Sequence, residues 1–170
     1  MKRTLAALLM LCAVIGCKKE NSSVESTGPE VTDAQLFHMA LATPKAAFYK
    51  NSTDTIQGNS GTAHPGKILV WYNAIAKEQL DAQGKVKASA SFSDSALIVK
   101  EIFNNNERTA IAVLYKLRSA ANAGANGWVW SEMDGTGSPL ISAKEKGNGC
   151  SGCHAIGSNV DYTRMNDAHP

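Results

Sequence analysis

Two cysteines and a histidine stand close together near the end of the chain, in the segment KGNGCSGCHAIG at residues 146–157. Cys150 and Cys153 are separated by two residues, and His154 follows directly. Two thiols at this spacing can add to the two vinyl groups on one side of a porphyrin, and the next imidazole can bind its iron. The motif therefore predicts one covalently bound haem c, with Cys150 and Cys153 as attachment residues and His154 as the iron ligand.

Three other chemistries use a Cys-x-x-Cys pair. A thioredoxin-like redox pair opens a helix inside a βαβ unit, and too little chain follows Cys153 to build that unit. A structural zinc site needs four ligands, yet no second cysteine pair exists beyond residue 17, so His169 would add only one remote ligand. A disulfide between Cys150 and Cys153 would be strained. Haem attachment is the interpretation that the residues favour.

The position of the motif bears on the kind of haem site. Small electron-transfer cytochromes place this motif early and take a second axial ligand from a downstream methionine. Here Met165 is the only later methionine. A tail this short is poorly suited both to wrap a haem and to deliver an axial sulfur. We therefore expect the preceding strands to form the opposite wall, with one protein ligand on the iron and an open sixth position for a small molecule.

The N-terminus has the layout of a secretory signal peptide. MKRTLAALLMLCAVIGC begins with two basic residues, continues with an apolar stretch at residues 5–15, and ends in small Gly16 before Cys17. The apolar stretch is shorter than the roughly 20 residues that a membrane-spanning helix needs. We expect residues 1–16 to be removed on export; a retained N-terminal anchor is the alternative.

The residues VIGC, which end at Cys17, resemble the lipobox of bacterial lipoproteins, in which the cysteine becomes the first mature residue and carries lipid. Cys17 is therefore the expected lipidation site, and ordinary cleavage elsewhere is the alternative. Several acyl chains would hold the domain at the periplasmic or cell-surface side of a bacterial membrane, with membrane contact through the lipid alone. Residues 17–31, polar with Ser, Gly and Pro, are expected to form a flexible tether.

The remaining chain, residues 32–170, is long enough for one domain with its own core. The formal charge of the whole chain is +2, and loss of Lys2 and Arg3 with the signal peptide brings it to zero. Because no basic patch is present, no nucleic-acid partner is expected. Cys12 also leaves with the signal peptide, so the mature chain has too few cysteines for a disulfide framework.

The elements that must position the motif follow from hydrophobic periodicity. We expect a helix that starts at Thr32 or Asp33 and ends before Pro44. The period of two along residues 109–118 indicates a sheet with one face buried more deeply than the other. The predicted class is α+β, mainly an antiparallel β-sheet with a few flanking helices. The other expected elements are strands at 67–73, 95–103, 108–118 and 128–133, a helix at 74–83 before Gly84, and a helical or turn region at 139–157.

Two charges interrupt the strand expected at residues 95–103. Lys100 shares a face with Ile98 and Ile102, while Glu101 lies on the opposite face. An edge strand whose long side chains reach water is favoured by the pattern alone. A lysine directed into a haem pocket is the alternative.

From about His64 to the C-terminus, four segments stand out together: HPGKILVWYN, FSDSALIVKEIFNN with its Val-Lys-Glu core, GWVWSEM and CSGCH. In these segments the chain resembles the cytochrome P-460 family. The resemblance implies a mainly antiparallel β fold, a homodimer, and a five-coordinate haem c. It also implies that Lys100 is bonded to a meso carbon of the porphyrin and that the iron site oxidises hydroxylamine to nitrogen oxides. Electrons would then pass to an acceptor such as another cytochrome c.

The resemblance leaves the distal side chains of the site less well defined. The family's enzymes use a distal carboxylate, and Ala143 stands near its expected place. Glu145, two residues away, is our candidate for this catalytic role, and Glu132 is the alternative. A basic distal residue from the first family strand is matched only by nearby Lys67.

A related family, cytochrome c′-beta, provides the second interpretation. That family shares the fold of the cytochrome P-460 family, lacks a working cross-link, and binds nitric oxide or carbon monoxide in an apolar pocket. Simple electron transfer is the third interpretation. His38 is expected on a peripheral helix, and His64 in a turn rather than as a ligand. Four aromatic residues could line such a pocket, although these spacings are also typical of ordinary core: Phe92, Phe103, Trp128 and Trp130.

Overall fold

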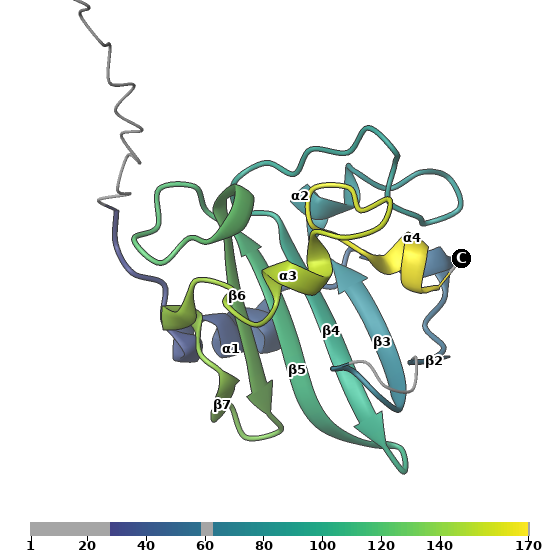
Figure 1. The fold of residues 1–170 in the computed structure, drawn as a ribbon. Coiled ribbons are helices and arrows are strands. Elements are labelled where there is room, and N and C mark those ends of the chain that lie inside the picture. The colour runs from purple at the N-terminus through teal and green to yellow at the C-terminus, as the bar shows by residue number, and fades with distance from the viewer. Residues whose placement is uncertain (1–27, 59–62, 170) are drawn as a thin grey trace, which may run out of the picture.

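The computed structural model describes residues 28–58 and 63–169 (Figure 1). The expected signal peptide, the lipidation site Cys17 and most of the tether lie outside the described residues. At the end of the tether, Val31 is buried, and its backbone N–H donates to the Asn122 side chain at 3.0 Å. The packed domain therefore includes Val31. Each helix in the described ranges is too short or too polar to cross a membrane.

A seven-stranded antiparallel sheet forms the centre of the molecule. The expected class, an antiparallel sheet with a few helices, is confirmed. The strand order is β1-β3-β4-β5-β6-β7, and β2 also pairs with β3. The strands are β1 (Ala47–Phe48), β2 (Ile56–Gln57), β3 (Lys67–Tyr72), β4 (Leu97–Asn104), β5 (Glu107–Lys116), β6 (Trp128–Asp134) and β7 (Pro139–Ile141).

The two faces of the sheet are covered by different parts of the chain. Helix α1 (Asp33–Ala42) lies behind the sheet in Figure 1, and its Leu36 and Ala40 pack on the odd-numbered strand residues. The other face is covered by α2 (Ala74–Lys77), α3 (Ser151–His154) and α4 (Met165–Ala168). The 3₁₀ helices are η1 (Tyr49–Asn51), η2 (Ala125–Gly127) and η3 (Ala143–Glu145).

The N-terminus of α1 ties the rear of the sheet to the segment that leads into the cysteine motif. Thr32, one of the two expected start residues, caps the helix in a reciprocal bond pair with Gln35. The Asp33 carboxylate accepts hydrogen bonds from the Ser142 hydroxyl and from the Ala143 N–H, each at 2.7 Å. Burial raises the pKa of Asp33, but these bonds and one from Ser131 outweigh it and lower the pKa.

The helix expected at residues 74–83 is wrong beyond Lys77. After Lys77 the chain turns, because the Asp81 carboxylate accepts the N–H groups of Gln83 and Lys85, both at 2.9 Å. Leu80 then pairs with Val86 as an isolated bridge.

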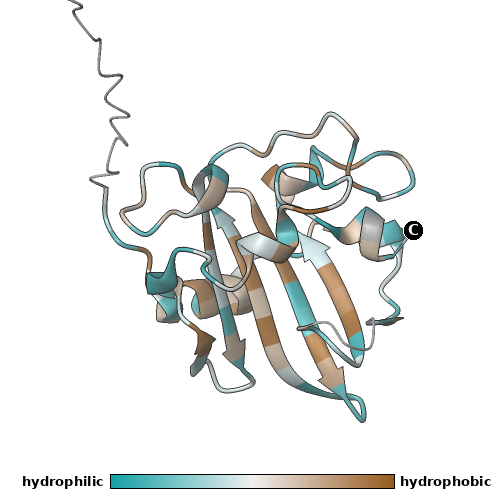
Figure 2. Ribbon diagram, in the orientation of Figure 1, coloured by the Kyte–Doolittle hydropathy of each residue, from teal (hydrophilic) through white to brown (hydrophobic). Residues whose placement is uncertain are grey.

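Strand β4 lies between β3 and β5, so the edge-strand interpretation of its charged pair is wrong. Figure 2 shows a hydrophilic break midway along this mostly hydrophobic strand, LIVKEIFN. Glu101 points to the α1 face, where it accepts from Lys45 Nζ at 2.5 Å and from Trp71 Nε1 at 2.9 Å. Lys100 points to the other face, toward the C-terminal segment.

Candidate functional site

A pocket of about 300 Å³ lies between the sheet and the C-terminal segment. Its volume falls in the range typical of small-molecule and cofactor sites. The cysteine motif, Arg164 and α4 form the opposite wall. The sheet side is mainly aliphatic: Ile68, Val70, Ile98, Ala112, Leu114 and Ile141.

Two charged residues occupy one row that crosses the sheet under this pocket. Lys100 pairs with Ala112 of β5, and Ala112 pairs with Glu132 of β6. Lys100 and Glu132 are thus two strands apart, about 10 Å at the usual strand spacing. Because Ala112 is small, the space above it is left open between them.

His64 bridges the two charged residues from the loop that precedes β3. Its Nδ1 lies 2.9 Å from Lys100 Nζ, and its Nε2 lies 3.2 Å from Glu132 Oε2. An ionised carboxylate only accepts, which assigns the ring proton to Nε2 and leaves Nδ1 to accept from the lysine. Lys100, His64 and Glu132 therefore form one hydrogen-bonded chain, hereafter the Lys–His–Glu chain.

Burial lowers the pKa of Lys100 to about 8, an effect that nearby Glu132 opposes and Arg164 strengthens. A lysine with this pKa exchanges its proton near neutral pH, which an ordinary lysine does not. The Lys–His–Glu chain can therefore take up and release protons at the pocket wall.

The cysteine motif is presented by a glycine turn that rests on Trp130. Gly147 has φ of +76°, and a Cβ on it would lie 2.6 Å from Trp130 Cδ1. Its carbonyl accepts the N–H groups of Cys150 and Ser151, both at 2.9 Å, which starts the motif's helical turn. A residue with a side chain at position 147 would push the motif away from the sheet.

Both cysteines of the motif are free thiols. Cys150 is partly buried, and burial raises its pKa to about 11, with further contributions from Glu132 and Glu145. Cys153 is exposed. Two free thiols separated by two residues beside a pocket are what thioether attachment requires.

His154 is held in one orientation. Its Nδ1 lies 2.8 Å from the Tyr162 carbonyl oxygen, and its ring meets the Trp130 ring edge-on at a centroid distance of 5.0 Å. Burial lowers the pKa of His154 to about 4, so the imidazole is neutral. Because a carbonyl only accepts, Nδ1 carries the proton and Nε2 keeps its lone pair. Metal-binding histidines have this arrangement.

The residues around the pocket fit a haem c. Cys150 and Cys153 could attach it, His154 Nε2 could bind its iron, and the aliphatic strand face could cover the porphyrin. Arg164 Nε is buried with no hydrogen-bond partner among the described residues, so it can donate to a carboxylate such as a haem propionate. Within residues 28–58 and 63–169, no group of three or more His, Cys, Asp or Glu side chains could hold a metal ion.

Several residues singled out in the sequence lie away from the pocket lining. Glu145, the carboxylate candidate, instead caps η3, where its side chain accepts from the Ser142 N–H at 3.4 Å. Ala143 is buried in the core beside α1. Lys67 is exposed and contacts Asn106 at 3.4 Å. The pocket carboxylate is Glu132, our alternative candidate.

Within the part of the chain that the structure describes, none of the four aromatic candidates lines the pocket, and three of them are core residues, as the alternative interpretation expects. Phe92, Trp128 and Trp130 belong to the buried core cluster beneath the C-terminal segment, so aliphatic strand residues line the pocket in their place. Phe103 lies outside the lining as well. His38 is exposed on α1, as expected.

Three ionisable residues of the pocket lining were missed as site residues: His64, Arg164 and His169. His64 does lie in a turn, as predicted, but its side chain reaches the Lys–His–Glu chain. Strand register was the missing information, because only the pairing of β4, β5 and β6 brings Lys100 and Glu132 to one row. Met165 also lines the pocket, although we expected the short tail to contribute no axial ligand.

No model of a known protein family matches the chain, and no curated protein shows significant similarity to it.

Proposed function

We propose that this chain is an exported, lipid-anchored haem c protein of the cytochrome P-460 type that oxidises hydroxylamine or a similar small nitrogen compound. The observation that supports this best is the Lys–His–Glu chain in an otherwise aliphatic pocket beside the Cys-x-x-Cys-His motif. A site that only binds a neutral gas has no need of a proton acceptor, whereas an oxidation that releases protons does.

The chain's own residues would divide the work. Cys150 and Cys153 would hold the haem, and His154 would bind its iron through Nε2. When bound, haem supplies an iron centre that takes electrons from the substrate and passes them to an acceptor such as another cytochrome c. The aliphatic strand residues would exclude water from the sheet side of the pocket.

Oxidation of hydroxylamine to nitric oxide releases as many protons as electrons. Glu132 would accept protons at the pocket wall, and His64 would pass them along the hydrogen bonds that join it to both partners. Lys100 would carry the cross-link to the porphyrin that the family resemblance implies. An amine whose pKa is lowered to about 8 is a better nucleophile at neutral pH than an ordinary lysine. The new bond would replace one amine N–H and the meso C–H, so its formation would also need a two-electron oxidant such as a peroxide, which takes up the two electrons and two protons released.

Binding of nitric oxide or carbon monoxide without turnover is the second candidate. The aliphatic lining of the strand side favours it, since diatomic gases partition into apolar space. In that case the protein would bind the gas and leave hydroxylamine unchanged.

Hydroxylamine consumption tests the proposal and separates the two candidates. The ferric protein, mixed with hydroxylamine and an electron acceptor, should consume it well above the rate of free haem. Glu132→Gln should lower the rate about 10²-fold, the usual contribution of an acid–base group. Glu145→Gln is the matched control and should leave the rate unchanged, because Glu145 lies outside the pocket lining.

Wild-type consumption no faster than free haem would rule out the enzyme and leave gas binding. A low-spin, six-coordinate spectrum before any gas is added would instead favour electron transfer, with a residue such as Met165 on the sixth position.

A further inference from the structure

The chain beyond the cysteine motif turns sharply at Asp161 and Tyr162. Val160 and Thr163 pair across the turn through backbone hydrogen bonds of 2.9 and 3.3 Å. Asp161 and Tyr162 both have positive φ, 49° and 62°. Two successive left-handed residues are typical of type I′ turns, where Asn and Gly are usual. Because tyrosine is disfavoured there, contacts outside the turn must hold it.

The carbonyl groups of the two central turn residues, Asp161 and Tyr162, both accept hydrogen bonds from ring N–H groups. The Asp161 carbonyl accepts from Trp128 Nε1 at 2.8 Å. The Tyr162 carbonyl lies 2.8 Å from His154 Nδ1. The orientation of the turn therefore sets the direction in which the His154 ring is held.

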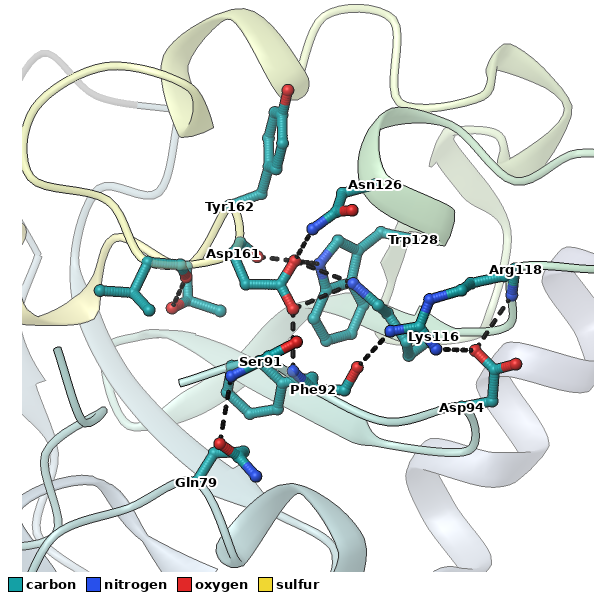
Figure 3. Close-up of polar contacts among 12 residues, drawn as sticks. Gln79, Ser91, Phe92, Asp94, Lys116, Arg118, Asn126, Trp128, Asp161 and Tyr162 are labelled. Atoms are coloured by element: carbon teal, nitrogen blue, oxygen red, sulfur yellow. Dashed lines mark hydrogen bonds and ion pairs between the residues drawn. The ribbon is translucent and has the colours of Figure 1, made fainter. Parts of the chain in front are cut away.

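The Asp161 carboxylate fixes this turn to the sheet, as Figure 3 shows. Lys116 Nζ donates to its two oxygens at 2.8 and 3.0 Å, and the Phe92 N–H donates at 2.9 Å. The side chains of Asn126 and Trp128 donate to it as well. Any displacement of Asp161 would leave several donors without an acceptor in a mostly buried site.

The ion pair is deeply buried. The Lys116 side chain is 0% exposed and the Asp161 side chain 4% exposed, and the lysine also lies over the Trp128 ring. A buried ion pair is seldom more stabilising than apolar residues of the same volume. Its distinguishing property is directional: it holds one carboxylate, and with it one turn, in a single geometry.

We propose that the Lys116–Asp161 pair is a positioning device for His154. The pair fixes the turn, and the turn's Tyr162 carbonyl holds the imidazole by its Nδ1 proton. Nε2 is thereby kept as the ligand atom. This inference rests on the proposed haem ligation by His154. Lys116 and Asp161 are positioning residues, since neither lines the pocket.

The proposal predicts an effect on the iron and not only on the fold. A second-shell hydrogen bond to a ligating imidazole raises its basicity and strengthens its bond to the metal. A looser turn would weaken that bond and stabilise the ferrous state relative to the ferric state, which raises the reduction potential.

The test compares Asp161→Asn with Asp94→Asn in the haem-loaded protein. Asp94 pairs with Arg118 at 2.8 Å in the same region, but both side chains are about half exposed, so this pair is a matched control that does not touch the turn. The readouts are the iron–histidine stretching frequency of the ferrous protein, by resonance Raman spectroscopy, and the reduction potential. Asp161→Asn should lower the frequency and raise the potential, and Asp94→Asn should change neither.

Unchanged frequency and potential in Asp161→Asn, with only a lower melting temperature, would reduce the pair to a structural role and overturn the inference. If Asp161→Asn does not fold, Lys116→Gln decides on the same criterion, since glutamine keeps a donor at that place without the charge. Wild-type protein without covalent haem would contradict the proposed function and this inference together. Wild-type protein with haem and unshifted variants would overturn this inference alone.

Discussion

Lys100 and Lys116 point to the same face of the sheet, yet only Lys116 is in direct contact with a carboxylate that balances its charge. Burial lowers the pKa of both. Lys116 is compensated by the Asp161 carboxylate, in direct contact at 2.8 Å. Lys100 contacts the imidazole of His64, and the carboxylate of Glu132 lies one residue further away. Lys116 is therefore suited to hold a structure, and Lys100 to give up its proton.

Titration of the Lys100 amine checks this difference. In a Cys150→Ala, Cys153→Ala chain, which cannot attach haem, Lys100 stays a free amine. Its folded pKa of about 8 lies below the ordinary lysine value, so the neutral, reactive fraction rises as pH increases through 8. Acylation by a small reagent, followed by peptide mass spectrometry, should show this midpoint for Lys100. A rate at Lys100 that still climbs steeply between pH 9 and about 10.4 would contradict it.

The expected cross-link is a second property of Lys100. Haem-loaded protein that is denatured and digested should yield a haem peptide with two segments, one around Cys150–His154 and one with Lys100. Lys100→Met should give the first segment alone and the absorption spectrum of ordinary haem c. A wild-type haem peptide without the Lys100 segment would refute the cross-link and leave haem attachment intact.

At the scale of elements, the turn before α3 decides how the cysteine motif meets the sheet. Gly147 lies against the Trp130 ring with a left-handed backbone, whereas Gly152, inside α3, has open space where a Cβ would be. The same substitution at the two glycines therefore has different consequences.

Gly147→Ala should lower the free energy of unfolding by about 1–2 kcal/mol from the backbone alone, and by more if Trp130 shifts. The yield of covalent haem per polypeptide should fall with it. Gly152→Ala should leave the free energy of unfolding unchanged or raise it by less than about 1 kcal/mol. Urea denaturation and haem quantification measure both variants; equal behaviour would show that the contact with Trp130 has no role.

The sequence predicted the ranges of the helices and strands better than it predicted which strands are neighbours in the sheet. Strands rich in β-branched residues and the capped helix α1 lie close to their expected ranges, because these signals are local. The position of β4 inside the sheet was not predicted, since β3 reaches it from far along the chain. Glu145 is the first candidate because it stands two residues from Ala143, near the place that the family resemblance implies, and a position along the sequence does not show which strand row faces the pocket.

At the scale of the whole molecule, the two faces of the sheet have different roles. Its odd-numbered residues pack against α1 and form a closed core, while its even-numbered residues face the C-terminal segment and the pocket. Asp33 and Asp161 fasten the chain on either side of the cysteine motif, the first through Ser142 and Ala143 and the second through Lys116. The motif is thus anchored at both ends, although it lies near the end of the chain.

The central claim is that a haem is bonded to Cys150 and Cys153. The most direct measurement is the absorption spectrum of the polypeptide after extraction with acidified acetone, using protein matured in an export-competent host with cytochrome c assembly. We predict that the haem absorbance stays with the polypeptide and is lost in the Cys150→Ala, Cys153→Ala chain. A colourless wild-type protein, or haem that leaves with the solvent, would contradict the account.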